Sequence, residues 1–229
     1  PYMDNYNYHK GMNGIIQELK CLLKTKSIGT DSDRALLLDF QATLETKPEK
    51  AIKLEKDALA QIETITVDNA RLVSNLHANL GGLYRMNGHP DLAREHMEKS
   101  ISLLDQFNLL HINDSIPQIA NYAMFLTEQQ EPERGISELQ KLSGIIKEYH
   151  SDHCLDYAKV QETLGTIYLM TANLPQAKTH FKRAFKIYEK IWTDEPEMIE
   201  AKYQEIQELY PQVGFFLGQQ LSDFLTKQT

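Results

Sequence analysis

The recurrence of proline at a fixed interval constrains the fold of this chain more than any other feature. Pro48, Pro90 and Pro132 are spaced 42 residues apart, and Pro175 misses the next position by one residue. Proline suits the first turn of a helix, because its missing N–H would have no partner there in any case. Proline at a fixed interval within polar, helix-forming sequence therefore predicts the same turn in a repeated two-helix unit.

Other positions repeat with the same interval. Large apolar residues recur where two helices interdigitate, and small residues recur where they approach closely. Asp39 is the exception at a small position that Gly81, Ala123 and Gly165 occupy in the later units. The remaining aligned series are Leu38, Leu80, Tyr122 and Leu164; Ala51, Ala93, Gly135 and Ala177; and Glu55, Met97, Leu139 and Phe181.

The apolar spacing within each unit is helical, as in Leu72, Leu76, Leu80, Leu83 and Tyr84. Between two such stripes Gly88 is suited to closing one helix and Pro90 to opening the next. The sequence thus predicts an all-α fold without strands: a leading helix over 4–24, hairpins over 32–64, 70–108, 115–149 and 154–191, and a degenerate hairpin over 195–209 and 212–226. We predict N-caps at Asp31 or Ser32, at Ser115 and at Asp194.

The segments Asn79–Tyr84 and Thr163–Tyr168, with the small residues that follow them, resemble tetratricopeptide repeats. The 42-residue unit is similar to the kinesin-light-chain subtype, and to the sensor regions of Gram-positive peptide-pheromone receptors. The resemblance implies a right-handed α-α superhelix, with the first helix of each hairpin on the concave face. We therefore expect one domain over 1–229, with the leading helix in 1–30, four hairpins in 31–192 and a C-terminal cap in 193–229. Such arrays bind peptides or partner helices in the groove and are generally not enzymes.

Composition excludes several classes of partner. The net charge is −8, from 32 acidic and 24 basic residues, which argues against a nucleic-acid surface and against docking on anionic lipid. Only two cysteines, Cys21 and Cys154, fit a reducing compartment. No apolar run approaches the roughly 20 residues that span a bilayer, so we expect a cytoplasmic protein. Because the chain begins at Pro1, we expect it to be a piece of a longer protein.

One helical face is the candidate peptide-binding site. Arg71, Asn75 and Asn79 are four residues apart and share that face. Asn121 aligns with Asn79 one unit on, and Lys159 aligns with Asn75 two units on. An Asn amide both donates and accepts, so it can pair with the backbone of an extended peptide, and Arg71, Arg85 and Lys159 can meet its carboxylates. The alternative is that these are ordinary solvated helix residues.

The only cluster with metal-ligand chemistry runs from His150 to Cys154. His111 lies 42 residues before His153, so the loops that carry them should be neighbours. The residues are contiguous, however, and not spaced like a zinc site, so we predict no metal and no other cofactor. No catalytic set has local support in the sequence, and we expect no enzyme activity.

The last predicted helix carries apolar residues on one side. It either caps the final repeat or forms a homodimer surface, because such side chains are costly to expose. The residues are Val213, Phe216, Leu217, Leu221 and Phe224.

Three functions remain open at this point. The first is a scaffold that holds a peptide or protein segment in the groove of the repeats. The alternative is the ligand-sensing region of a signalling receptor or transcription regulator whose output domain precedes Pro1. In that case peptide binding would change the superhelix, since each repeat touches only its neighbours and small rotations add up. The third is a structural spacer with no ligand in the groove.

Overall fold

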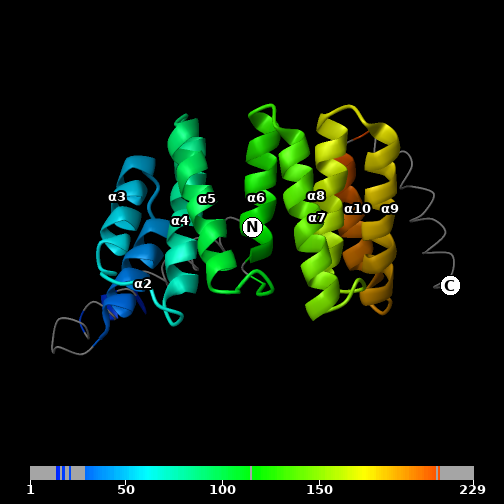
Figure 1. The fold of residues 1–229 in the computed structure, drawn as a ribbon. Helices are drawn as coiled ribbons and strands as arrows, with labels where there is room; N and C mark the ends of the chain where they lie inside the picture. The colour runs from blue at the N-terminus through cyan, green and yellow to red at the C-terminus, as the bar shows by residue number, and fades with distance from the viewer. Residues whose placement is uncertain are drawn as a thin grey trace. The chain divides into compact units, whose positions relative to one another are not determined.

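The computed structural model describes residues 29–113 and 115–209, together with positions 14, 15, 17, 18, 21 and 211. Within the 29–113 and 115–209 ranges the regular structure is helical, without strands (Figure 1). The helices are α2 (Asp31–Thr43), α3 (Pro48–Leu59), α4 (Ala70–Met86), α5 (Pro90–Gln106), α6 (Ser115–Glu128), α7 (Pro132–Tyr149), α8 (Leu155–Met170), α9 (Leu174–Ile191) and α10 (Pro196–Leu209).

The helices group into two compact units that divide between Leu109 and Leu110. Unit 1 contains α2 to α5, and unit 2 contains α6 to α10. In both units the closest packing joins consecutive helices: α2 with α3 and α4 with α5, then α6 with α7 and α8 with α9. These pairs are the four predicted hairpins, and α10 is the first helix of the predicted degenerate hairpin. Most of the predicted leading helix and the helix over 212–226 lie outside the described residues.

The repeated prolines stand where the interval predicts. Pro48, Pro90 and Pro132 are the first residues of α3, α5 and α7, and Pro175 is the second residue of α9. At these positions a missing N–H leaves no helical hydrogen bond unmade. The prediction from the proline interval is confirmed.

The turn before each of the last three of these helices contains a residue with left-handed backbone geometry. The residues are Gly88 with φ 75°, Gln130 with φ 65° and Ala172 with φ 58°, again 42 residues apart. Glycine adopts this geometry without strain, whereas side chains with a Cβ atom do not. The turn is therefore fixed by the repeat even where the sequence does not supply glycine.

The small positions are points of close helix contact. A Cβ atom on Gly81 would lie 2.6 Å from Met97 Cγ, and one on Gly165 would lie 2.8 Å from Phe181 Cδ2. Met97 and Phe181 are 4% and 0% exposed, so they have little room to move away. The alignment of small residues against large ones is thus confirmed by direct contact in α4–α5 and α8–α9.

All three predicted helix caps differ from the structure; α10, for example, begins at Pro196, two residues after the predicted cap Asp194. Thr30, rather than Asp31 or Ser32, is the N-cap of α2: its hydroxyl accepts from the Asp33 N–H, and the Asp33 carboxylate accepts from the Thr30 N–H at 2.6 Å. This reciprocal pair satisfies two N–H groups at once, which a cap one residue later would not. Ser115 begins α6, and its hydroxyl donates to the carbonyls of Leu110 and Ile112.

Polar contacts attach α10 to the last complete hairpin. Lys202 Nζ of α10 lies 3.0 Å from Glu162 Oε1 of α8, and the Tyr188 hydroxyl of α9 donates to Glu162 Oε2 at 2.7 Å. Burial lowers the pKa of Lys202, but its contacts with Glu162 and Glu205 outweigh that effect and raise it. One carboxylate therefore ties three helices of unit 2 together.

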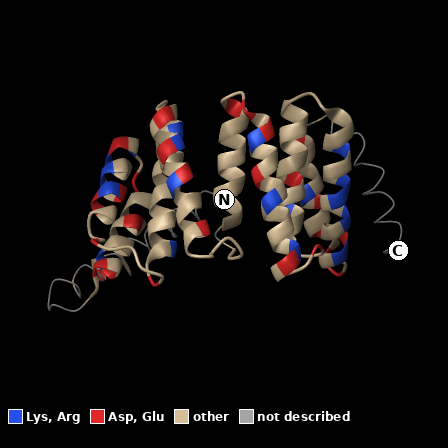
Figure 2. Ribbon diagram, viewed as in Figure 1, with Lys and Arg blue, Asp and Glu red and all other residues tan. Residues whose placement is uncertain are grey.

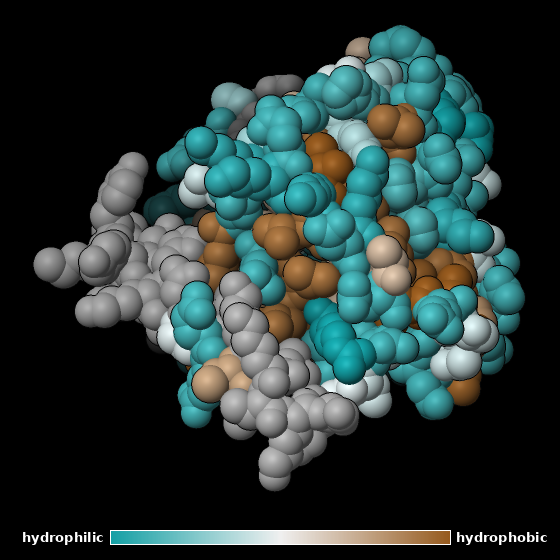
Figure 3. Space-filling view, turned by 90° about the vertical axis from the view of Figure 1, so that its left-hand side faces the viewer, coloured by the Kyte–Doolittle hydropathy of each residue, from teal (hydrophilic) through white to brown (hydrophobic). Residues whose placement is uncertain are grey.

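Surface hydropathy varies on unit 1. The end of the unit that carries α2 and α3 faces the viewer in Figure 3, where hydrophobic groups reach the surface between hydrophilic ones. Leu36 of α2 is 39% exposed, and Val67 before α4 is 66% exposed.

Among the described residues, no helix is both long and apolar enough to span a membrane.

Candidate peptide-binding faces

In unit 1 the predicted residues lie along α4. Arg71 and Asn79 are exposed, and Asn75 and Arg85 are half-buried. Arg85 belongs to the last turn of the helix. Helical spacing extends the same face to Met86, which is 82% exposed and was not singled out in the sequence.

Asn79 has contacts within unit 1 that the sequence did not reveal. Its Nδ2 donates to Asp39 Oδ1 of α2 at 2.9 Å and to Glu55 Oε1 of α3 at 3.2 Å. The amide therefore links three helices of the unit. Asn79 is exposed, so its side chain remains accessible at the edge of this face, although its amide NH2 group already donates to the two carboxyl groups.

Of the two acids that accept from Asn79, Glu55 is buried and Asp39 is half-buried. Glu55 is 2% exposed, and its Oε2 has no hydrogen-bond partner within the described part of the chain. Burial raises the pKa of Glu55 to about 9, and the neighbouring Asp39 carboxylate adds to the rise. The pKa of Asp39 is also raised, mainly by burial, although its contacts with Glu55 and Asn79 act in the opposite direction. Glu55 is consequently protonated at neutral pH.

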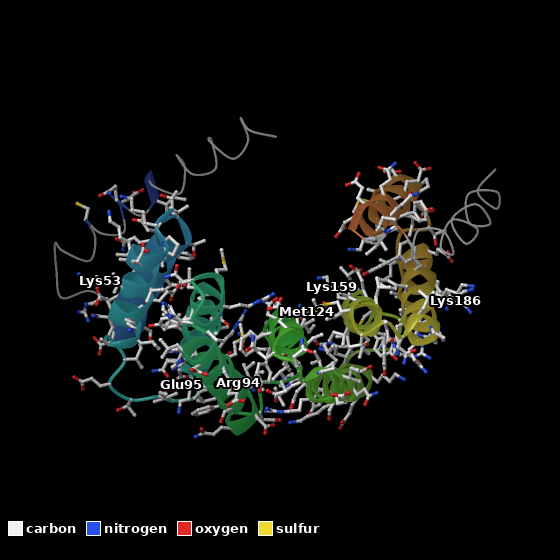
Figure 4. The ribbon with its side chains drawn as sticks, turned by 90° about the horizontal axis from the view of Figure 1, so that it is seen from above. Lys53, Arg94, Glu95, Met124, Lys159 and Lys186 are labelled. Carbon is white, nitrogen blue, oxygen red and sulfur yellow. The ribbon has the colours of Figure 1, made fainter. Side chains whose placement is uncertain are left out.

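In unit 2 the predicted residues come from two neighbouring helices. Asn121 lies on α6 and Lys159 on α8, both are exposed, and α6 packs against α8. Lys159 Nζ lies 3.8 Å from Asp156 Oδ1, an exposed contact of little energetic consequence. In Figure 4 Lys159 and the half-buried Met124 lie on one side of unit 2, while Lys186 of α9 lies on the other.

Exposed methionines mark corresponding ends of α4 and α8. Met86 is 82% exposed and Met170 is 47% exposed, and they are separated by 84 residues, twice the repeat interval. Helical spacing places Met86 on the face of Asn79 and Met170 on the face of Thr163. Methionine adapts its shape to varied apolar partners, so these residues add apolar contact to polar faces. Their spacing was visible in the sequence but was not noticed.

A second repeated feature lies between the helices of two hairpins. His96 stacks on Tyr84 with ring centroids 5.4 Å apart, and His180 stacks on Tyr168 at 5.3 Å. His96 Nδ1 lies 2.9 Å from Nδ1 of His77, and His180 Nδ1 lies 2.9 Å from Oε1 of Gln161, the residue that corresponds to His77.

These histidines are packed against neighbouring side chains and are neutral. Burial lowers the pKa of both His77 and His180 to about 4, so both are neutral at physiological pH. No group of three or more His, Cys, Asp or Glu side chains able to hold a metal ion occurs among the residues that the structure describes. The repetition of the stack in two hairpins accounts for these residues without a ligand.

The predicted proximity of two histidine-bearing loops is confirmed. His150 Nε2 donates to the His111 carbonyl at 2.8 Å, and the His111 ring stacks on Tyr149 with centroids 4.8 Å apart. The residues predicted for self-association, in contrast, lie outside the described residues. They are Val213, Phe216, Leu217, Leu221 and Phe224.

Known proteins share both the repeat and the fold. Residues 115–190 match the model of the tetratricopeptide repeat family. The structure of BtubC (BKLC) from P. vanneervenii is similar with a TM-score of 0.70 and 18% identity, covering 96% of this chain and 87% of that one. No curated protein sequence matches the chain.

Two further solved structures are similar. The kinesin-light-chain TPR-like repeats from Podosopora anserina, in their Q17M form, give a TM-score of 0.65 at 13% identity and cover 82% of this chain and 92% of that one. MamA gives 0.55 at 15% identity, with 83% and 96% covered. Residues 115–190 thus match the tetratricopeptide repeat, and the chain shares its fold with the kinesin-light-chain TPR-like repeats. The resemblance to pheromone-receptor sensor regions stays a prediction.

Proposed function

We propose that the chain is a non-catalytic scaffold that binds an extended peptide or protein segment on the exposed faces of its first helices. These faces are α4 in unit 1, and α6 with α8 in unit 2. Proteins of this repeat family typically mediate protein interactions and are not catalysts, which supports the class of function. In a repeat array the first helices supply an extended surface, so one segment can contact several of them.

The observation that carries the proposal is the matched polar surface of unit 2. Asn121 and Lys159 are exposed on adjacent helices, at positions where unit 1 carries Asn79 and Asn75. Asparagine is a poor helix former, so its presence at the exposed position 121 of α6 favours a role in binding. An amide can pair with the backbone of an extended segment, and Lys159 can pair with a carboxylate on it.

The test uses unit 2, because Asn79 is also needed inside unit 1. Peptides are selected from a random-sequence phage library on the wild-type chain, and their affinities are measured by calorimetry. Asn121→Ala together with Lys159→Ala is expected to weaken binding by roughly 1–3 kcal/mol for each buried partner that is lost. Thermal unfolding should be unchanged, because both side chains are exposed.

The matched control is Gln140→Ala together with Lys141→Ala. It removes one amide and one amine from exposed positions of the second helix α7. Affinity of the control should stay within about twofold of the wild type, or less than about 0.5 kcal/mol. Equal losses in the two double variants, or no loss in either, would contradict the assignment of this face.

Two finer statements about partners remain predictions. One is self-association through the C-terminal helix, for which Phe216→Asp should yield a monomer by light scattering. The other is the alternative function as a ligand-sensing region of a peptide-responsive receptor or regulator. A helix-turn-helix encoded upstream of Pro1 in the full-length gene would favour that alternative over a scaffold. A cytoplasmic location likewise stays a prediction.

A further inference from the structure

A basic cavity lies in unit 2, lined by residues of the second helices rather than by the proposed peptide-binding face. It has a volume of about 380 Å³ and receives Lys147 from α7, Tyr157 from the first turn of α8, and Arg183, Lys186 and Lys190 from α9. Asp152 and His153 of the intervening loop complete its polar lining. Figure 2 shows Lys and Arg gathered along α9.

The packing of α9 places these cations on one face. Phe181, Phe185 and Tyr188 are buried against unit 2. The side chains at 183, 186 and 190 follow helical spacing on another part of the helix and share one face with each other. The apolar side of α9 packs against the rest of unit 2, so its positively charged side chains line the cavity.

Within the described part of the chain, the lining of the cavity carries an excess of positive charge. Four cationic side chains line it against one carboxylate, Asp152, and that carboxylate is paired with His153 Nδ1. Lys147 Nζ lies 5.2 Å from the centre of the Tyr157 ring, and Arg183 donates to Gln161 Oε1 at 3.3 Å. Neither contact adds negative charge. In a chain of net charge −8, such a local concentration of cations attracts an anionic partner.

We propose that this cavity binds a phosphate monoester carried by a phosphorylated side chain of a protein partner. A phosphomonoester carries close to two negative charges at neutral pH and offers three acceptor oxygens. Those oxygens match a set of amine and guanidinium donors that converge from two helices. A single carboxylate would balance only one of the four cations. The cavity is thus suited to a dianion.

The remaining surface favours a protein as the source of the phosphate. The overall negative charge repels nucleic acid and anionic membranes, both of which present long arrays of phosphates. A single phosphorylated residue needs only a local cation cluster, and the chain offers that here. Tyr157 is 4% exposed and has Lys147 over its ring, so it offers little surface for stacking a nucleotide base. This site is separate from the Asn121–Lys159 face, and its test does not depend on that face.

The test is a titration followed by amide NMR shifts, with four probes: blocked phosphoserine, blocked serine, blocked aspartate and inorganic phosphate. Blocked phosphoserine is expected to shift amides of residues 183–190 and 152–157 saturably, with a Kd of about 1 mM or tighter. Blocked aspartate should bind at least about tenfold more weakly, because it carries half the charge and fewer acceptors.

The site variant is Lys186→Gln together with Lys190→Gln, and the matched control is Lys50→Gln together with Lys53→Gln on exposed α3. The site variant should weaken phosphoserine binding about tenfold or more, and the control should leave it within about twofold. Retained binding in the site variant, or aspartate binding as tight as phosphoserine, would overturn the proposal. Inorganic phosphate that binds about tenfold tighter than phosphoserine would also overturn it, in favour of a free-phosphate site.

Discussion

The first and last complete hairpins use the same contact position in opposite ways. In α8–α9 the small residue Gly165 lies against the buried ring of Phe181. In α2–α3 the corresponding residues are Asp39 and Glu55, two acids that both accept a hydrogen bond from Asn79. The repeat therefore fixes that the position is buried but not what fills it. The α2–α3 hairpin of unit 1 has a half-buried Asp39 and a buried Glu55 where the α8–α9 hairpin of unit 2 has an apolar contact.

The two contacts differ in what they contribute to the stability of the fold. Burying carboxyl groups costs solvation energy, and Glu55 Oε2 has no hydrogen bond from the described residues to offset it. Gly165 and Phe181 contribute apolar burial with no such cost. We therefore predict that the contact between Asp39 of α2 and Glu55 of α3 limits the stability of unit 1. The same contact holds Asn79 at the edge of the α4 face.

Replacing the acid pair should give the largest effect. Asp39→Gly with Glu55→Met copies the Gly81–Met97 contact of α4–α5. Replacing a buried ionisable pair with well-packed apolar residues often stabilises a protein, here by about 1–4 kcal/mol at pH 7. Denaturant unfolding measures the change, and hydrogen exchange assigns it to unit 1. A loss of stability would mean that the acid pair is a net stabilising contact, and the comparison would fail.

The pH dependence of unit 1 should give an intermediate effect. The folded-state pKa of Glu55 is about 9, above its ordinary value of 4.5, so the folded state holds a proton that the unfolded state has released. Stability is therefore greatest below the ordinary pKa and falls as pH rises toward 9. The neutral histidine His77, with a lowered pKa of about 4, acts in the opposite sense below pH 6.5. The window from pH 7 to 9 isolates Glu55.

Between pH 7 and 9 the wild-type unit 1 should lose stability, by at most about 1.4 kcal/mol per pH unit. Glu55→Gln keeps a neutral hydrogen-bonding group of similar size and should remove most of that slope. Unit 2 provides the internal reference, since its corresponding residue is Phe181. Equal slopes for wild type and Glu55→Gln in hydrogen-exchange free energies would show that Glu55 does not hold the proton in the folded state.

The fold was largely predictable, because one interval fixed it. The prolines, the small positions and the apolar stripes all repeat every 42 residues, so each hairpin supports the assignment of the others. The predicted hairpin over 70–108, for example, corresponds to α4 and α5 over Ala70–Gln106. The cap at Thr30 was missed because its recognition depends on Asp33 reaching back, a contact that neighbouring Asp31 and Ser32 obscure.

The candidate sites were less predictable. Asn79 was identified as a surface residue, but its bonds to Asp39 and Glu55 join residues 40 and 24 positions away. Asp39 was visible as an exception to the small series, yet only the packing of three helices shows what it meets. The basic cavity was missed for a similar reason. Lys147 and Lys190 look like ordinary helix-surface lysines until the fold brings them to one hollow.

The smallest expected effect concerns the turns, where the repeats also differ. Gly88 has φ 75° in the α4–α5 turn, whereas Ala172 has φ 58° in the α8–α9 turn. Left-handed geometry costs an alanine about 1 kcal/mol relative to glycine. Ala172→Gly should therefore stabilise unit 2 by at most about 0.5–1 kcal/mol. Glycine also raises the conformational entropy of the unfolded chain, which offsets part of this gain.

The control is Ala201→Gly, at an exposed position inside α10. Glycine there should destabilise unit 2 by about 1 kcal/mol, because it lowers helix propensity without relieving any strain. Opposite signs for the two substitutions in thermal unfolding would show that the repeat, and not the local sequence, imposes the turn geometry. Destabilisation by both would mean that the α8–α9 turn accommodates alanine without strain, and that the hairpins differ at their cores but not at their turns.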